Sequence, residues 1–250
     1  MSGIAAVFYR EAKIRFTNFL WMFWDLLYPL GYLMVFGVGM SHMMPAPAGA
    51  ESVDYNAFFL AGVLGMASFG IAANTAWGFF VDRDNGIFFE MLTYPMRHAE
   101  YLLGNCLFNL LIALGQAAVT IVLARTVLSV PVQFSTTPLL CAAVIVGTAG
   151  WFFFYAIFAL IIRRNDLFNT VTSLFYFVFL FASSMFYPVD PLPSPIRELA
   201  YANPITWQVD VLRYATIGFG APSTIVLEAI AFCAFSAVSF AAALWALRRQ

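Results

Sequence analysis

The densest group of charged side chains in this sequence lies between two apolar stretches, at residues 82–100. Asp82, Arg83 and Asp84 stand together there, and Glu90 follows six residues later. Such a concentration of charge must lie in water, because each ionised side chain is costly in an apolar environment. The group has no cysteine or metal-ligand spacing beside it. Its chemistry is therefore that of recognition, and we expect these residues to bind another protein.

The residues after this charged triplet predict a turn and a short amphipathic helix. Asn85 and Gly86 favour a sharp turn, apolar residues follow at helical spacing, and Pro95 ends the pattern. An apolar face with a charged rim is how a small protein interface is built. A solvated loop without a partner is the alternative. The predicted interface residues are Asp82, Arg83, Asp84, Gly86, Phe88, Phe89, Glu90 and Pro95.

Composition indicates the elements that must position this group. The 250 residues are 62% hydrophobic and 10% charged, and the mean hydropathy is +0.84. A soluble domain of this length would lack the polar residues to cover its surface, so we expect an all-α polytopic membrane protein. Apolar stretches long enough to cross the hydrocarbon predict six spans in a single domain of residues 1–250. They lie at about 19–40, 58–81, 101–124, 139–162, 167–187 and 225–247.

Residues 1–18 predict an amphipathic helix lying on the membrane, with Ile4, Phe8, Ala12 and Phe16 on its apolar face. A frayed tail is the alternative. Asp25 interrupts the first span, and a carboxylate in lipid should face protein, water or a cation such as Arg15. Asp25 therefore has either a structural pairing or a place on a substrate path.

Basic residues predict the orientation. Most of the 12 lysines and arginines fall on the side of the two termini and of the 82–100 loop. By the positive-inside rule, both termini and this loop are cytoplasmic, and the connection at 188–222 is extracytoplasmic.

The outer connection contains two further predicted helices. Ser194-Pro195 and Asn203-Pro204 each place a capping side chain before proline, so a short helix should begin at each, and the second should end at Gly218. Both are too short to span, and we expect them to dip into the outer leaflet as re-entrant helices. Asp210 and Arg213 have the spacing of an ion pair. The predicted outer-gate residues are Asn203, Pro204, Asp210 and Arg213; a fold-stabilising corner is the alternative.

Glu228 lies near the start of the sixth span, at a depth similar to these two helices. With Asp25, it is the second candidate for a substrate path.

The order and spacing of these motifs resemble the membrane-spanning permease subunits of type 2 ABC exporters, in particular the lipo-oligosaccharide (nodulation-factor) and daunorubicin branch. The resemblance covers essentially the whole chain. Its motifs are Phe36-Gly37-Val38-Gly39-Met40, Tyr55-Asn56-Ala57-Phe58-Phe59, residues 82–86 with Glu90 and Pro95, Phe186-Tyr187-Pro188, and residues 202–213.

The resemblance implies a non-catalytic subunit powered by two copies of a separate ATPase. These would contact residues 1–17 and a coupling helix at about 85–94. The chain's own residues agree, because no G-x-x-x-x-G-K-[ST] loop is present and the one lysine is Lys13. ATP and Mg would be bound by the ATPase, with no cofactor or metal in this chain. A second permease copy is expected, with a homodimer favoured over a heterodimer, in the inner (plasma) membrane among lipids and without nucleic acid.

Two other classes stay open on the sequence. An ATP-independent secondary transporter or channel would carry ionisable residues at the bilayer midplane, whereas Asp25 and Glu228 lie nearer the ends of their spans. An integral membrane enzyme would need clustered acidic residues and histidines, whereas His42 and His98 are expected on opposite sides of the membrane.

Overall fold

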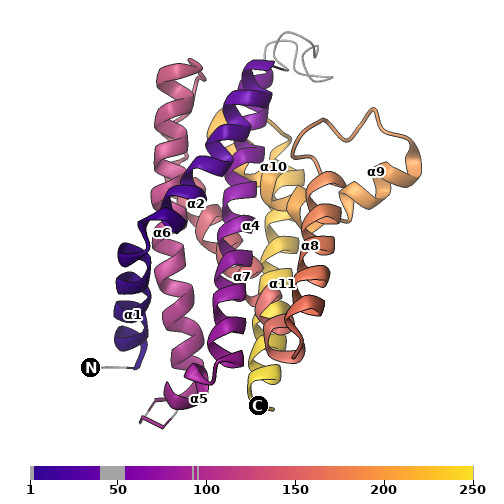
Figure 1. The fold of residues 1–250 in the computed structure, drawn as a ribbon. Coiled ribbons are helices and arrows are strands. Elements are labelled where there is room, and N and C mark those ends of the chain that lie inside the picture. Colours follow the sequence, from indigo (N-terminus) through magenta and orange to yellow (C-terminus); the bar gives the residue numbers. More distant parts are fainter. Residues whose placement is uncertain (1–2, 40–53, 92, 95, 250) are drawn as a thin grey trace.

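The structure is a computed structural model and describes residues 3–39, 54–91, 93–94 and 96–249. The ordered elements in these ranges are all helical (Figure 1). They are α1 (Gly3–Thr17), α2 (Phe19–Tyr32), the π-helix η1 (Leu33–Val38), α4 (Tyr55–Asp84), α5 (Ile87–Met91), α6 (His98–Val127), α7 (Thr137–Ile161), α8 (Asn165–Phe181), α9 (Ser194–Tyr201), α10 (Pro204–Ile217) and α11 (Pro222–Leu247).

Helix α4 is the centre of the bundle. It packs against α2, α6, α7 and α10, and α7 in turn packs against α11. Phe59, Leu60 and Ala61 are fully buried. A helix that is apolar on all sides is stable only when other elements surround it, which is why the long apolar stretch after Tyr55 lies inside the bundle.

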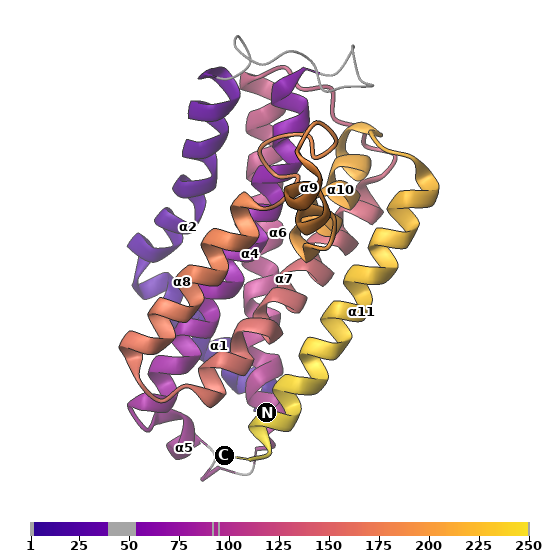
Figure 2. The ribbon, with the colours of Figure 1, turned by 90° about the vertical axis from the view of Figure 1, so that its right-hand side faces the viewer.

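Helix α8 approaches α4 through side chains rather than through close backbone packing. The ring centroids of Phe80 and Phe168 are 4.6 Å apart, and those of Phe69 and Tyr176 are 5.0 Å apart. Figure 1 shows α2 and α8 on either side of α4, and Figure 2 shows α11 on the far side of α7 from α2. The aromatic rings hold α8 at a distance that leaves room for a cleft between α2, α4 and α8.

Four of the described helices are long and apolar enough to cross a membrane: Tyr55–Asp84, Ala99–Val127, Thr137–Ile161 and Pro222–Leu247. The six-span count stays a prediction, because α8 has 17 residues and the first predicted span runs to residue 40, outside the described ranges. Both chain ends and α5 lie at one end of the bundle, whereas α10 lies towards the other (Figure 1).

The fifth predicted span is wrong at its end. It was expected to run to Tyr187, but α8 ends at Phe181 and the chain continues as a bent segment in which Ser184 and Met185 are buried. The serines explain the stop, because their hydroxyls hydrogen-bond locally and compete with the helix. Ser183 Oγ donates to the carbonyl of Leu180 at 2.7 Å.

Helix α1 is present as predicted, and its contact with α6 centres on Val7, a residue that the predicted membrane-facing side did not include. Val7 is fully buried, and a Cβ added at Gly104 of α6 would lie 2.6 Å from Val7 Cβ, so only glycine permits this approach. Phe8 packs edge-on against Phe108 at 5.5 Å. Phe16, assigned to the apolar face, is 67% exposed. The helix is thus docked on α6 through its first half.

Candidate functional site

The charged triplet belongs to the last turn of α4 rather than to a loop. Helix α4 continues to Asp84, past the predicted end of the span at residue 81. Gly86 follows with φ of 78°, a left-handed conformation that glycine adopts without strain, and α5 begins at Ile87. Asp82 and Arg83 therefore extend from a rigid helix at an angle of about 100° to each other.

Asp82 binds α1 to the bundle. Its two carboxylate oxygens accept hydrogen bonds from Nη1 and Nη2 of Arg10, both at 2.7 Å, and Tyr101 Oη on α6 donates to it at 2.5 Å. A bidentate arginine–carboxylate pair fixes orientation as well as distance. One side chain thus joins α1, α4 and α6.

Arg83 points to a different neighbour and is only 7% exposed. Its guanidinium donates to the carbonyls of Ala159, Leu160 and Ile162, the Leu160 bond being 2.7 Å. These carbonyls lie in the last turn of α7 and at its C-cap, Ile162, the part of a helix where carbonyls are commonly bound by side chains. Arg83 is therefore committed to holding α4 against α7 and is not part of an exposed rim.

The two adjacent phenylalanines of α5 lie in different environments. Phe88 is fully buried, with its ring centroid 5.5 Å from Phe79 and 5.2 Å from Tyr101. Phe89 is 48% exposed, and Asp84 and Glu90 are also exposed. The surface offered outwards is therefore Asp84, Phe89 and Glu90. Pro95 lies outside the described residues.

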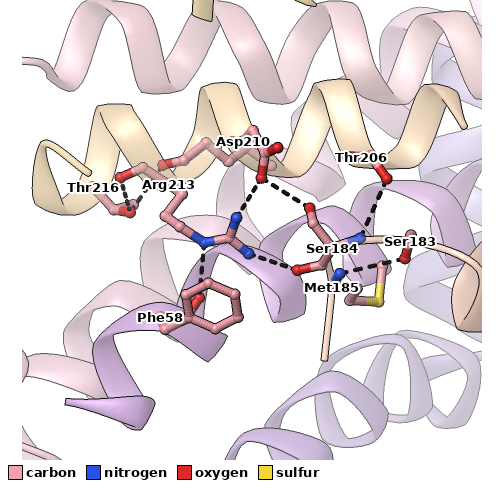
Figure 3. A network of polar contacts seen from close by, with 9 residues as sticks. Phe58, Ser183, Ser184, Met185, Thr206, Asp210, Arg213 and Thr216 are labelled. Carbon is pink, nitrogen blue, oxygen red and sulfur yellow. Dashed lines mark hydrogen bonds and ion pairs between the residues drawn. The ribbon is translucent and has the colours of Figure 1, made fainter. Parts of the chain in front are cut away.

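The predicted ion pair between Asp210 and Arg213 is present and is part of a larger network (Figure 3). Arg213 is 3% exposed and donates to Asp210, to the Ser184 carbonyl at 2.7 Å and to the Phe58 carbonyl at 3.4 Å. Its guanidinium carbon lies 3.8 Å from the centroid of the Phe58 ring. Asp210 also accepts from Ser184 Oγ at 2.8 Å. These contacts join α10 to α4 and to the segment after α8.

Asn203 makes hydrogen bonds at the ends of two helices. Its Oδ1 accepts from the Ile205 N–H at 3.0 Å, which is the predicted N-cap, with Pro204 as the first residue of α10. Its Nδ2 donates to the carbonyls of Phe179 and Ala182 at 2.8 and 2.5 Å. Asn203 thus caps the beginning of α10 and the end of α8 together. The predicted N-cap at Ser194 is wrong. Helix α9 begins at Ser194 itself, its N-cap residue is Pro193, and no side chain caps it.

The two candidate residues for a substrate path, Asp25 and Glu228, lie in different places. Asp25 accepts from Arg15 at 2.7 Å, the predicted pairing, and from Asn74 Nδ2 at 2.9 Å. Glu228 on α11 interacts electrostatically with Asp210 and Arg213, and its Oε2 is buried with no hydrogen-bond partner among the described residues.

A cleft of about 800 Å³ opens between α2, α4 and α8. Sequence reasoning placed only Asp25 there and missed the polar residues opposite it. The signal was present, because Asn169, Thr172, Ser173 and Tyr176 recur at helical spacing in an otherwise apolar stretch. The residues that give the cleft its chemistry are Trp24, Asp25, Asn74, Trp77, Asn169 and Thr172.

Comparison with known proteins agrees with this architecture. Residues 3–217 match the family described as ABC-2 type transporter. The chain is also similar to the protein named transport permease ycf38 in Porphyra purpurea, with 21% identity over 190 residues, covering 76% of this chain and 65% of that protein. The ycf38 protein of Pyropia yezoensis is 21% identical over 214 residues, covering 82% of this chain and 73% of its own length.

The chain spans slightly less than two thirds of the Porphyra relative, at 65% of its length. The family match, by contrast, extends from α1 to the end of α10. Together with the long apolar helices, this match identifies a multi-pass membrane protein. The chain therefore belongs to the ABC-2 type transporter family.

Proposed function

We propose that this chain is the permease subunit of an ATP-driven exporter, which moves or flips an amphipathic, lipid-linked or hydrophobic cargo from the cytoplasmic side. Two ATPase subunits bind ATP and Mg, and a second permease, most simply an identical one, completes the path. The assembly lies in the inner (plasma) membrane with both termini cytoplasmic. Family membership supports the assignment, as does the position of both chain ends and α5 at one end of the bundle.

The observation that carries the proposal is the exposed surface of α5. Asp82, Arg83 and Phe88 are occupied by contacts within the chain, whereas Asp84, Phe89 and Glu90 face outwards. An aromatic side chain that is 48% exposed, with two exposed acidic residues close to it in the sequence, fits an interface anchor with a polar rim. We propose that the ATPase binds to this surface.

Movement of α5 would reach the rest of the chain through the last turn of α4. Asp82 connects that turn to α1 and α6, and Arg83 connects it to the end of α7. A displacement imposed by the ATPase is therefore distributed over four helices. Coupling further requires that α5 bind the ATPase with different affinity in its two states, because equal affinity would shift no equilibrium.

In this proposal, the cargo enters the cleft that contains Asp25 and leaves past the network around Asp210 and Arg213. The network, with Asn203 and Pro204 at the start of α10, forms the outer gate. Glu228 lies beside it on the proposed exit route.

The test is retention of the ATPase by purified variants in detergent, together with transport in vesicles. Phe89→Ala should lower affinity for the ATPase by about thirtyfold, the effect of removing an anchor worth ~2 kcal/mol, and should abolish transport without changing thermal stability. Phe88→Ala should instead destabilise the permease, because the ring is fully buried.

Phe134→Ala is the matched control, because Phe134 is 59% exposed in the connection between α6 and α7, away from α5. It should retain the ATPase as wild type does. Wild-type retention by Phe89→Ala would show that α5 is not the coupling element.

A further inference from the structure

A second cavity, of about 210 Å³, lies where α1 meets α4 and α6. Its lining includes Glu11 of α1, Asp82 of α4 and Asn109 of α6. Ile14 and Trp77 also line it and are 40% and 36% exposed, and the Trp77 side chain borders the larger cleft as well. The volume is that of about seven water molecules at about 30 Å³ each. A polar group of a few atoms therefore fits inside, with an apolar remainder at the surface.

The charged side chains around this cavity include one carboxylate that is incompletely compensated. Arg10 gives Asp82 a bidentate pair, and the same Nη1 also donates to Glu11 Oε1 at 2.7 Å. Arg15 pairs with Asp25 at 2.7 Å. These ion pairs comprise three carboxylates and two guanidinium groups. Glu11 is the carboxylate left with a shared donor, and its Oε2 accepts no hydrogen bond among the described residues.

Two acceptors at this cavity therefore lack donors. The Glu11 side chain is only 14% exposed, and burial raises the pKa of its carboxyl group against the opposing effect of Arg10. Asn109 is 2% exposed, and its Oδ1 is buried with no hydrogen-bond partner among the described residues. Buried acceptors are costly when they are unpaired, and a buried carboxylate most of all. The cavity thus favours a ligand that carries N–H donors and a positive charge.

Arg15 adds a place for a negative group in the same cavity. It donates to Asp25 through Nη1, and its guanidinium makes no other hydrogen bond within the described part of the chain. The remaining N–H groups suit the oxygens of a phosphate. A primary ammonium joined to a phosphate by a short linker is the headgroup of an ethanolamine phospholipid. Lipids surround a multi-pass membrane protein, so they are the molecules that reach a cavity whose wall is partly exposed and apolar.

We propose that this cavity binds the headgroup of an ethanolamine phospholipid, which the protein holds as a resident lipid and does not transport. The ammonium donates to the Glu11 carboxylate and to Asn109 Oδ1, and the phosphate accepts from Arg15. The acyl chains leave the cavity past Ile14 and Trp77. A lipid held in this way joins α1 to α4 and α6, and its binding is independent of the cargo and of the ATPase.

The test is native mass spectrometry of the full chain, delipidated in detergent and titrated with three phospholipids of identical acyl chains. Phosphatidylethanolamine should bind most tightly. Phosphatidylcholine has the same charges but no N–H on its nitrogen, and it should bind about tenfold more weakly or worse, the effect of losing hydrogen bonds from a charged donor. Phosphatidylglycerol, which has no ammonium, should also bind more weakly.

Two results of this titration would overturn the proposal. Equal affinities for the ethanolamine and choline lipids would show that no acceptor in the cavity selects the ammonium. Binding of soluble phosphoethanolamine as tightly as of the lipid would show that the ligand is a free amine and not a phospholipid.

Glu11→Gln tests the carboxylate with little change of shape. It should remove most of the preference for the ethanolamine lipid over the choline lipid, and Asn109→Leu, which removes the unpaired oxygen, should reduce that preference several-fold. The preference is a ratio of two affinities measured on one variant, so a general loss of stability does not alter it. Glu198→Gln is the matched control, because it makes the same change at an exposed position of α9 and should keep the wild-type preference. A wild-type preference in Glu11→Gln would refute the site.

Discussion

Replacing Arg213 tests whether the network on α10 holds the fold together. In Arg213→Ala, Asp210 loses its charged partner and keeps the Ser184 hydroxyl as a donor, and the carbonyls of Phe58 and Ser184 lose the guanidinium. Removing one partner of a buried ion pair costs about 3–5 kcal/mol. Loss of the stacking on Phe58, at 3.8 Å, adds about 1–2 kcal/mol. Because a native protein is stable by only about 5–15 kcal/mol, this change should remove a large part of the total.

The assay is the temperature at which half of the detergent-purified protein stays monodisperse after heating. Arg213→Ala should lower it strongly. Arg213→Lys should have a temperature between those of wild type and Arg213→Ala, because an ammonium keeps the charge but not the planar fork that reaches several acceptors. Arg164→Ala is the control, since Arg164 pairs with Asp166 but is 77% exposed. If Arg213→Ala and Arg164→Ala had the same apparent Tm, the stabilising role of the network would be refuted, and a loss of transport alone would favour the gate.

Single cysteines at Asn85 and Ser194, in a background without native cysteines, should react with an impermeant thiol reagent from opposite sides of the membrane; labelling from one side would contradict the six-span topology. Arg83→Met should lower the unfolding temperature by removing donors from the end of α7, whereas Arg163→Met, at an exposed position, should not; equal temperatures would show that the capping adds no stability. Burial raises the pKa of Glu11, against the opposing effect of Arg10, so the charged carboxylate is disfavoured in the folded state. Glu11→Gln should therefore be more stable than wild type at neutral pH, and thermal unfolding across a pH series should show this advantage disappearing below about pH 4.3, the ordinary value for glutamate; a constant difference would contradict the cause.

The parts of the fold that the sequence predicted depend on local chemistry. Asn203 and Pro204 begin α10 and Gly218 ends it with φ of 71°, because capping and left-handed termination are decided by adjacent residues. The pairing of Asp210 with Arg213 follows from helical spacing. Asp25 was expected to face protein, water or a cation such as Arg15, and it pairs with Arg15.

What the sequence could not show is which acceptors a charged side chain finds. Arg83 was expected in an exposed loop, but it donates to backbone carbonyls at the far end of α7, and such acceptors have no signature in the amino-acid sequence. Phe88 and Phe89 are identical in type and adjacent, so only the direction of α5 decides that one is buried and the other exposed.

Asp82 and Arg83 also restrict how α4 can move. Each holds a different neighbour at the same turn, and rotating α4 about its own axis would carry both groups away from their partners together. At the other end, Tyr55 Oη donates to the Phe186 carbonyl at 3.1 Å and the Phe58 carbonyl accepts from Arg213, so that end resists twisting too. Tilting and sliding along the axis disturb these bonds less. Helix α4 should therefore transmit force by tilting or by sliding along its axis, and not by rotating about it.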